Sequence, residues 1–261
     1  PLSKIGCVFN PQNKKKLPLE IQGTNMPLAQ NHSENLGSAQ VKSAILMAAL
    51  DTPGITTIEE KKLSRNHTEN ILKAIGADIK IKKFKNQNLI FLRGQKDLDS
   101  FDLKIPGDPS SSAFFVALAL LTKGSVLKIK NINLNPFRIG YIRVLKKMNA
   151  KIKILNVKKK LGEPFGDIAV KYSNLKPIRF PIKEITSTID EFPILFIIAS
   201  QIKGLSIFTE IGELRHKESD RIKNIEFGLK KIGIKVVSTK NTIKIFGNPN
   251  IKIKKILEIN P

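Results

Sequence analysis

The residues best suited to chemistry are gathered in one stretch, 213–221, which reads Glu-Leu-Arg-His-Lys-Glu-Ser-Asp-Arg. Seven of these nine side chains are ionisable when histidine is counted, which is more than the capping of a following helix requires. Because residues four apart share a helix face, a helix here would place Lys217 beside Arg221, with Glu218 offset by one position. Such a group could hold an anion and move a proton. A salt-bridged helix start at the surface is the alternative interpretation.

The use of arginine points to the same stretch. Only seven of the 45 basic residues are Arg, and Arg215 and Arg221 both lie in it. Arg is the side chain that binds phosphate or carboxylate with two parallel hydrogen bonds. Arg65, in the polar segment 64–69, is a further candidate. His67 in that segment is also compatible with a polar residue at a helix start.

Polar clusters precede each of the most apolar segments, at 37–40, 106–112 and 186–191. Asp108 followed by Pro109 is a strong helix-start signal, and Ser or Thr can cap in the same way. Capping is the simplest interpretation of each cluster. Several helix N-termini facing one cleft would instead offer free N–H groups and positive dipole ends to an anion.

These segments belong to a repeat in which an apolar helix is followed by Gly and a β-branched strand. The helix and strand pairs are 44–50 with 55–58, 113–121 with 125–129, and 194–199 with 205–208. Each is followed by an amphipathic helix and an alternating strand, at 71–76 with 77–81, 144–148 with 150–154, and 229–233 with 234–237. The change from helical spacing to a period of two predicts helix followed by half-buried strand. We therefore expect an α/β fold, closed rather than a solenoid.

Composition narrows the possible functions. Hydrophobic residues make up 41% of the 261 positions, which suits a packed globular protein. The longest apolar run, 113–121, is far shorter than the roughly 20 residues of a membrane span. One cysteine and scattered single histidines predict no metal site. The net charge of +23 comes mainly from dispersed Lys, and aromatics are 6%, so we expect small anionic substrates and no nucleic acid as partners.

Seven motifs in order resemble those of the 5-enolpyruvylshikimate-3-phosphate (EPSP) synthase family. They are the segments 38–44, 64–69, 106–112, 135–140, 166–168, 189–194 and 214–221. The resemblance implies a two-domain inverse α/β barrel of repeated βαβαββ units, with residues 1–106 in one lobe and 107–261 in the other. It implies transfer of the enolpyruvyl group of phosphoenolpyruvate to the 5-hydroxyl of shikimate 3-phosphate, without metal or organic cofactor.

The resemblance also implies a role for individual residues. Asp190 would accept the proton of the attacking hydroxyl, and Lys217 and Glu218 would handle proton transfer to the enol. Arg221 would bind the carboxylate of phosphoenolpyruvate. The implied substrate-binding residues are Ser38, Ala39 (through its backbone), Gln40, Arg65, Asp190, Glu213, Lys217 and Arg221.

Segment 1–6 reads like the end of a further copy of the repeat, so we expect the chain to be a fragment that is inactive alone. The family's N- and C-terminal motifs have no counterpart in it. A cytoplasmic enzyme that is monomeric when complete is expected. The alternatives are a UDP-N-acetylglucosamine enolpyruvyl transferase, which uses a loop Cys unlike Cys7, an RNA 3′-phosphate cyclase with similar units, and a basic nucleic-acid-binding protein.

Overall fold

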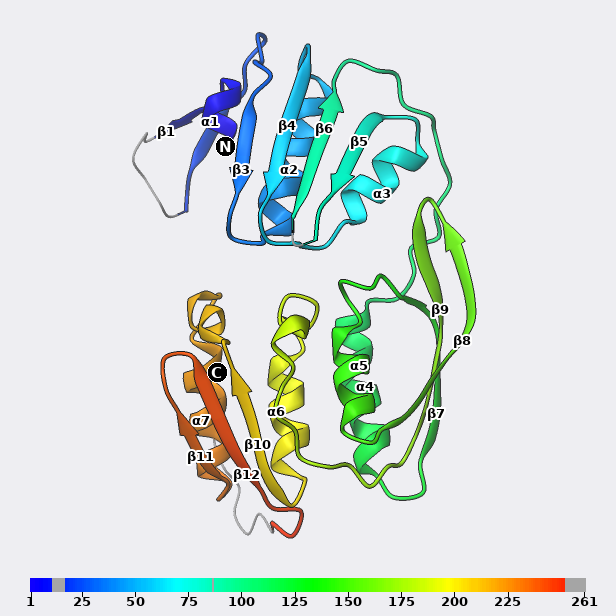
Figure 1. Cartoon of the computed structure of the whole chain (residues 1–261), viewed down its shortest axis with the longest axis vertical. Helices are drawn as coiled ribbons and strands as arrows, with labels where there is room; N and C mark the ends of the chain where they lie inside the picture. Colours follow the sequence, from blue (N-terminus) through cyan, green and yellow to red (C-terminus); the bar gives the residue numbers. More distant parts are fainter. Residues whose placement is uncertain (11–16, 86, 252–261) are drawn as a thin grey trace. The chain divides into compact units, whose positions relative to one another are not determined.

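The structure, a computed structural model, describes residues 1–10, 17–85 and 87–251. Contacts divide the chain into two compact units: the first contains residues 1–104 and 159–163, and the second contains 105–158 and the residues from 164 onward. Each unit has its own hydrophobic core, and Figure 1 shows the helices and strands that make up each unit. The assignment of 1–106 and 107–261 to the two lobes of a complete barrel stays a prediction.

The first unit consists of a short antiparallel ribbon and a mixed sheet with two helices. In chain order its elements are α1 (Leu2–Ile5), β1 (Val8–Asn10), β2 (Glu20–Gln22), β3 (Asn31–Glu34), α2 (Ala39–Leu50), β4 (Ile55–Glu60), α3 (His67–Ala74), β5 (Asp78–Lys83) and β6 (Asn88–Arg93). The sheet order is β3-β4-β6-β5. Strand β3 runs parallel to β4, and the other pairs are antiparallel.

The core of the first unit forms where α2 packs on β4 and β6 and α3 packs on β5. Ile45 and Leu46 of α2 meet Ile58, Ile90 and Leu92 of the sheet, all of them buried. Strand β4 alternates buried and less buried positions, as expected of a strand with one face on a core. This packing fixes the position of α2 relative to β4.

The second unit contains two further helix-and-sheet groups. Its elements are α4 (Pro109–Leu121), β7 (Val126–Asn133), α5 (Gly140–Lys147), β8 (Lys151–Lys160), β9 (Glu163–Lys171), the 3₁₀ helix η1 (Ile182–Glu184), α6 (Phe192–Ser200), β10 (Gly204–Thr209), the 3₁₀ helix η2 (Gly212–His216), α7 (Arg221–Lys231), β11 (Lys235–Ser238) and β12 (Thr242–Gly247). The turn of the β8–β9 hairpin belongs to the first unit. The sheet orders are β7-β9-β8 and β10-β12-β11.

The predicted repetition is confirmed within the described ranges, which contain three copies of helix, strand, helix, strand, strand. Each sheet places its last strand between the two preceding ones. The parallel strand before the first helix is β3 in one copy and a single bridge in the others, Gly107 with Ile132 and Arg179 with Ile207. The predicted α/β fold of repeated βαβαββ units is therefore confirmed.

A shared hydrogen bond marks the end of every copy. The amide that follows the last strand donates to the carbonyl at the end of the first helix: Gln95 to Leu50, Ser173 to Leu120 and Asn248 to Ser200. This contact fixes the length of the last strand relative to the helix it packs on. The C-terminal end of the first helix is thereby tied to the end of the sheet in each copy.

The core of the second unit is formed around α4 and α6, which pack against each other. Helix α6 is almost entirely apolar and buried. Phe180, Phe192, Phe196 and Phe208 pack ring against ring, with centroid separations from 4.7 to 6.3 Å. A rigid aromatic core thus supports the α6 N-terminus, directly after Asp190.

Candidate active site

Three of the predicted site residues come together in the second unit. Arg221, at the start of α7, lies with its Nη2 2.8 Å from Glu218 Oε2 and its Nη1 3.5 Å from Asp190 Oδ1. The Arg221 side chain is 23% exposed and that of Asp190 is 33% exposed, whereas Glu218 is 82% exposed. One guanidinium therefore links a carboxylate before α6 with a carboxylate before α7.

The stretch 217–221 does not form the helical turn in which Lys217 would lie beside Arg221. Residues 212–216 form η2, Lys217 has extended backbone angles, and α7 begins only at Arg221. Asp220 caps α7 by accepting a hydrogen bond from Lys223 N at 2.9 Å, and this cap explains why the helix starts there. Lys217 and Glu218 consequently lie in a bend outside any helix.

The remaining charges of the stretch are used in local pairing. Lys217 Nζ lies 2.7 Å from Glu213 Oε1. Arg215 Nη1 lies 2.7 Å from Asp220 Oδ2, and its guanidinium also donates to the carbonyl of Thr239 at 2.7 Å. Arg215 and Asp220 thus fasten the bend to the β11–β12 turn. The candidate functional groups of the stretch are the residues that pair with one another, Glu213 with Lys217 and Glu218 with Arg221.

The segment before α6, which carries Asp190, is held from two sides. Arg143 of α5 donates to Glu184 Oε2 at 2.7 Å and to Ser187 Oγ at 3.1 Å. Although burial opposes it, Arg143 and Ser187 lower the pKa of Glu184, so this carboxyl is ionised. At the other end, Ser110 Oγ donates to the buried Glu191 Oε1 at 2.5 Å. Asp190 is therefore presented by a restrained turn.

The predicted N-cap of α4 is confirmed and has a second partner. Asp108 Oδ2 accepts from Ser111 N at 2.7 Å, with Pro109 in the first turn, and its Oδ1 lies 2.5 Å from Arg138 Nη2. Although burial opposes it, the hydrogen bonds from Ser111 and the charge of Arg138 lower the pKa of Asp108. The role of this cluster is local, since it joins α4 to the segment before α5.

In the first unit, the predicted residues 38–40 form the start of α2. Ser38 caps the helix by accepting from Val41 N at 3.3 Å, while its own hydroxyl proton stays available. Ala39 and Gln40 occupy the first turn, where amides have no helical partner, and Gln40 is exposed. The preceding turn is fixed because Glu34 accepts from Gly37 N at 2.8 Å and from Leu36 N at 2.9 Å. Arg65 lies half-buried in the loop between β4 and α3.

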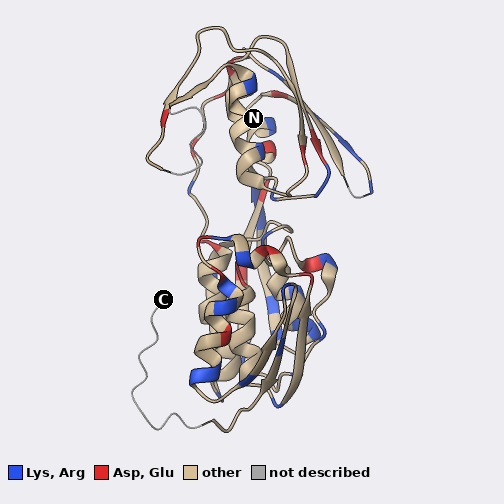
Figure 2. Cartoon of the chain, turned by 90° about the vertical axis from the view of Figure 1, so that its left-hand side faces the viewer, with Lys and Arg blue, Asp and Glu red and all other residues tan. Residues whose placement is uncertain are grey.

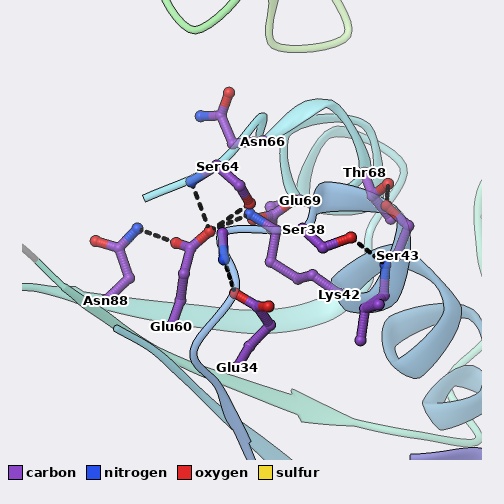
Figure 3. Close-up of polar contacts among 12 residues, drawn as sticks. Glu34, Ser38, Lys42, Ser43, Glu60, Ser64, Asn66, Thr68, Glu69 and Asn88 are labelled. Carbon is purple, nitrogen blue, oxygen red and sulfur yellow. Dashed lines mark hydrogen bonds and ion pairs between the residues drawn. The ribbon is translucent and has the colours of Figure 1, made fainter. Parts of the chain in front are cut away.

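A buried ionic cluster that the sequence motifs did not predict lies beside these residues. Lys42 Nζ lies 2.6 Å from both Glu60 Oε1 and Glu69 Oε1, and all three side chains are at most 1% exposed. Ser64 donates to Glu60 through its amide and its hydroxyl, and Asn88 donates to it at 2.8 Å (Figure 3). A Lys in an amphipathic helix normally indicates the solvent face, and nothing in the local sequence reverses that interpretation here.

The start of α3 receives a carboxylate from the β8–β9 turn. His67 Nδ1 lies 2.7 Å from Glu163 Oε2, and Asn70 Nδ2 donates to Glu163 Oε1 at 2.7 Å. Glu163 is 93 residues further along the chain than Asn70, so no local pattern could reveal the pair. His67 is thus a polar residue at a helix start, one of the two interpretations its segment allowed.

The electrostatic state of Glu218 bears on its chemistry. A hydrogen bond from its own backbone amide and then the Arg221 guanidinium hold its pKa below the ordinary value. Glu218 is therefore ionised near neutral pH. Lys and Arg are spread over helices and strands of both units, with Asp and Glu among them (Figure 2), so pairing within the site decides its charge.

Neither a metal cluster nor a membrane span stands out in the part of the chain that the structure describes. It contains no group of three His, Cys, Asp or Glu side chains suited to a metal ion. No helix within the same residues has the length and apolar character needed to cross a bilayer.

Known proteins similar to this chain show its family. The family model for EPSP synthase (3-phosphoshikimate 1-carboxyvinyltransferase) matches residues 1–256. The chain belongs to the EPSP synthase family. A 3-phosphoshikimate 1-carboxyvinyltransferase of Petrotoga mobilis is 44% identical over 254 residues, which is 97% of this chain and 58% of that protein.

Solved structures extend the comparison to the fold. EPSP synthase from Acinetobacter baumannii superimposes with a TM-score of 0.80 at 37% identity, over 93% of this chain and 54% of that one. The enolpyruvyl transferase NikO from Streptomyces tendae has a TM-score of 0.66 at 13% identity, over 94% of this chain and 56% of its own. This second likeness concerns the fold alone. The chain spans about half the length of the relatives it matches.

Proposed function

We propose that the whole protein transfers the enolpyruvyl group of phosphoenolpyruvate to the 5-hydroxyl of shikimate 3-phosphate and releases phosphate. The main support for this proposal is that Asp190, Glu218 and Arg221 lie together in a chain of the EPSP synthase family. The proposal concerns the whole protein because this chain spans about half the length of its relatives. A cytoplasmic location and a monomeric state stay predictions.

The reaction divides between the two carboxylates. Asp190 accepts the proton of the 5-hydroxyl, whose oxygen bonds to C2 of phosphoenolpyruvate, while Glu218 delivers a proton to C3. The resulting tetrahedral adduct then loses a proton from C3 and expels phosphate, which restores the carbon–carbon double bond. A positioned general acid and base of this kind lowers the barrier to both proton transfers.

Glu218 must become an acid for this step, although its lowered pKa keeps it ionised. Arg221, its ion-pair partner at 2.8 Å, is also the group proposed to bind the carboxylate of phosphoenolpyruvate. When substrate takes the guanidinium, Glu218 loses a stabilising charge and its pKa rises. Binding of phosphoenolpyruvate would thus prepare the acid that protonates it. Lys217, which is paired with Glu213, would take part with Glu218 in the proton transfer.

Shikimate 3-phosphate is proposed to bind at residues of both units. Ser38, Gln40 and the Ala39 amide form the start of α2, where the helix dipole favours an anion. Arg65 supplies a guanidinium for the phosphate, and Asp190 and Glu213 accept from the ring hydroxyls. The convergence of these groups on one cleft stays a prediction.

Ligand titration of the chain and turnover by the whole protein test the function. Calorimetry of the 261-residue chain with shikimate 3-phosphate should show saturable binding, which Asp190→Asn weakens. Release of phosphate from phosphoenolpyruvate should require shikimate 3-phosphate, occur in the whole protein and be absent from the chain alone. Binding of UDP-N-acetylglucosamine instead of shikimate 3-phosphate would overturn the proposal.

A further inference from the structure

The buried cluster of Lys42, Glu60 and Glu69 is poorly explained as a device for stability. Its side chains are at most 1% exposed, and removing charges from water costs about as much as their pairing returns. A well-packed apolar trio would stabilise the unit as well. Burial even raises the pKa of Glu69 despite the adjacent ammonium. Such a cluster can instead fix the positions of the segments that carry its three residues relative to one another.

The two carboxylates stand at the two ends of one loop. Glu60 is the last residue of β4, and Glu69 lies in the first turn of α3. The connecting segment 61–66 contains Arg65. Because Lys42 contacts both carboxylates at 2.6 Å, a single ammonium pins both ends of the loop. Ser64, next to Arg65, adds two hydrogen bonds to the same Glu60 oxygen, at 3.0 and 2.7 Å.

The same lysine stands one helical turn from the start of α2. Its amide donates to the carbonyl of Ser38 at 3.1 Å, so movement of the lysine is transmitted to the first turn. A second link lies alongside, where Ser43 Oγ and Thr68 Oγ1 are 2.7 Å apart. Figure 3 shows Lys42 reaching from α2 toward Glu60 and Glu69. The N-terminus of α2 and the loop with Arg65 are therefore held in one arrangement.

We propose that Lys42 is a positioning residue for anion binding in the first unit. Through Glu60 and Glu69 it sets the place of the Arg65 loop relative to Ser38, Ala39 and Gln40. The inference rests on the proposed function, since shikimate 3-phosphate is the anion that these groups would bind. Displacement of a binding group by an ångström weakens a site strongly, so loosening this cluster should lower affinity even where the fold survives.

The test uses a variant from which the charges are removed together. Lys42→Met alone would leave two carboxylates buried without a cation and can fail to fold. The triple variant Lys42→Met/Glu60→Gln/Glu69→Gln keeps side-chain size and leaves no unpaired charge. Ile90→Ala, in β6, is the matched control, because it opens the same core at a fully buried position without removing a charge of the cluster.

Amide exchange is measured first, without ligand. In the triple variant, exchange should increase together in 36–41 and 61–66, while β5 and β6 keep their protection. The control should change the β6 region and leave the two segments protected. Unchanged protection of both segments in the folded triple variant would overturn the positioning role.

Titration with shikimate 3-phosphate is the second readout, at a temperature where all variants are folded. Affinity should fall about tenfold or more in the triple variant and stay within about twofold of wild type in Ile90→Ala. Equal affinity in wild type and triple variant would overturn the inference. If the wild-type chain does not bind shikimate 3-phosphate, the proposed function fails for this chain, and the exchange measurement alone decides the role of Lys42.

Discussion

Glu69 carries the surplus negative charge of the buried cluster, since one ammonium faces two carboxylates. Within the described residues its Oε2 atom has no hydrogen-bond partner. Burial is the main cause that raises its pKa, and the charge of Lys42 offsets only part of the effect. Ionisation of this buried carboxyl therefore destabilises the folded protein.

The pH dependence of stability should reveal this cost. A folded-state pKa above the unfolded value gives stability that is complete below the unfolded pKa and is lost as pH rises through the folded pKa. Glu69→Gln should therefore unfold at higher urea concentration than wild type at pH 8, with the advantage disappearing toward pH 4. Urea titrations across this range measure it. A Gln variant that is less stable at pH 8 would contradict the prediction.

Arg221 should control the acidity of Glu218. Its guanidinium is the second cause, after a backbone hydrogen bond, that lowers the pKa of Glu218. Arg221→Gln should therefore raise this pKa part of the way to its ordinary value. An NMR titration of the labelled Glu218 carboxyl measures the change. Lys217→Gln is the control, because Lys217 is the smallest of the contributing causes and should move the pKa less.

At the scale of elements, the turn that presents Asp190 depends on a close approach of α5. A Cβ added to Gly140 would collide with Ser187 Oγ and Thr188 Oγ1. Gly140→Ala should therefore push this turn away and destabilise the unit by about 1–3 kcal/mol, measured by chemical denaturation. Gly23→Ala is the control, since a Cβ there meets nothing within 4 Å. An unchanged denaturation midpoint in Gly140→Ala would show that the close contact between α5 and this turn does not limit the side chain at position 140.

The repeating elements were the part of the fold most accessible from sequence. Apolar helices followed by Gly and alternating strands predicted α2, α4 and α6 with β4, β7 and β10, because local spacing governs those elements. Asp108 with Pro109 likewise predicted the start of α4. The spacing of Lys217 and Arg221 could not show where the following helix starts, and the cap by Asp220 makes it begin only at Arg221.

The site was accessible from sequence only in part. Motifs led to Asp190, Glu218 and Arg221, and the structure brings these together. Lys42 was missed because its partner Glu60 lies 18 residues away on another element. Glu163 was missed for the same reason, since its partners lie on α3. Tertiary pairing of charges leaves no periodic trace in a sequence, whereas amphipathic spacing does.

At the scale of the whole molecule, the outer face of α4 is apolar and exposed. Phe114 is 63%, Phe115 59% and Leu118 65% exposed, and such contiguous apolar surface promotes association. The chain should therefore self-associate at micromolar concentration. Phe114→Ser/Leu118→Lys should shift light-scattering mass toward the 29.1 kDa of a single chain without lowering the melting temperature. Persistent association in that variant would place the contact elsewhere.

The three copies of the repeat use the start of their first helix in different ways. The N-cap position of the first helix in each copy is Ser38, Asp108 or Glu191. Asp108 is engaged with Ser111 and Arg138, so the copy that contains α4 uses this position as scaffold. The copies that contain α2 and α6 place a candidate ligand-binding residue at this position or directly before it. The equivalent positions thus serve capping alone in one copy and lie at or beside candidate ligand contacts in the other two, so replacing Asp108 by Ser would be the first step toward giving α4 a helix start like that of α2.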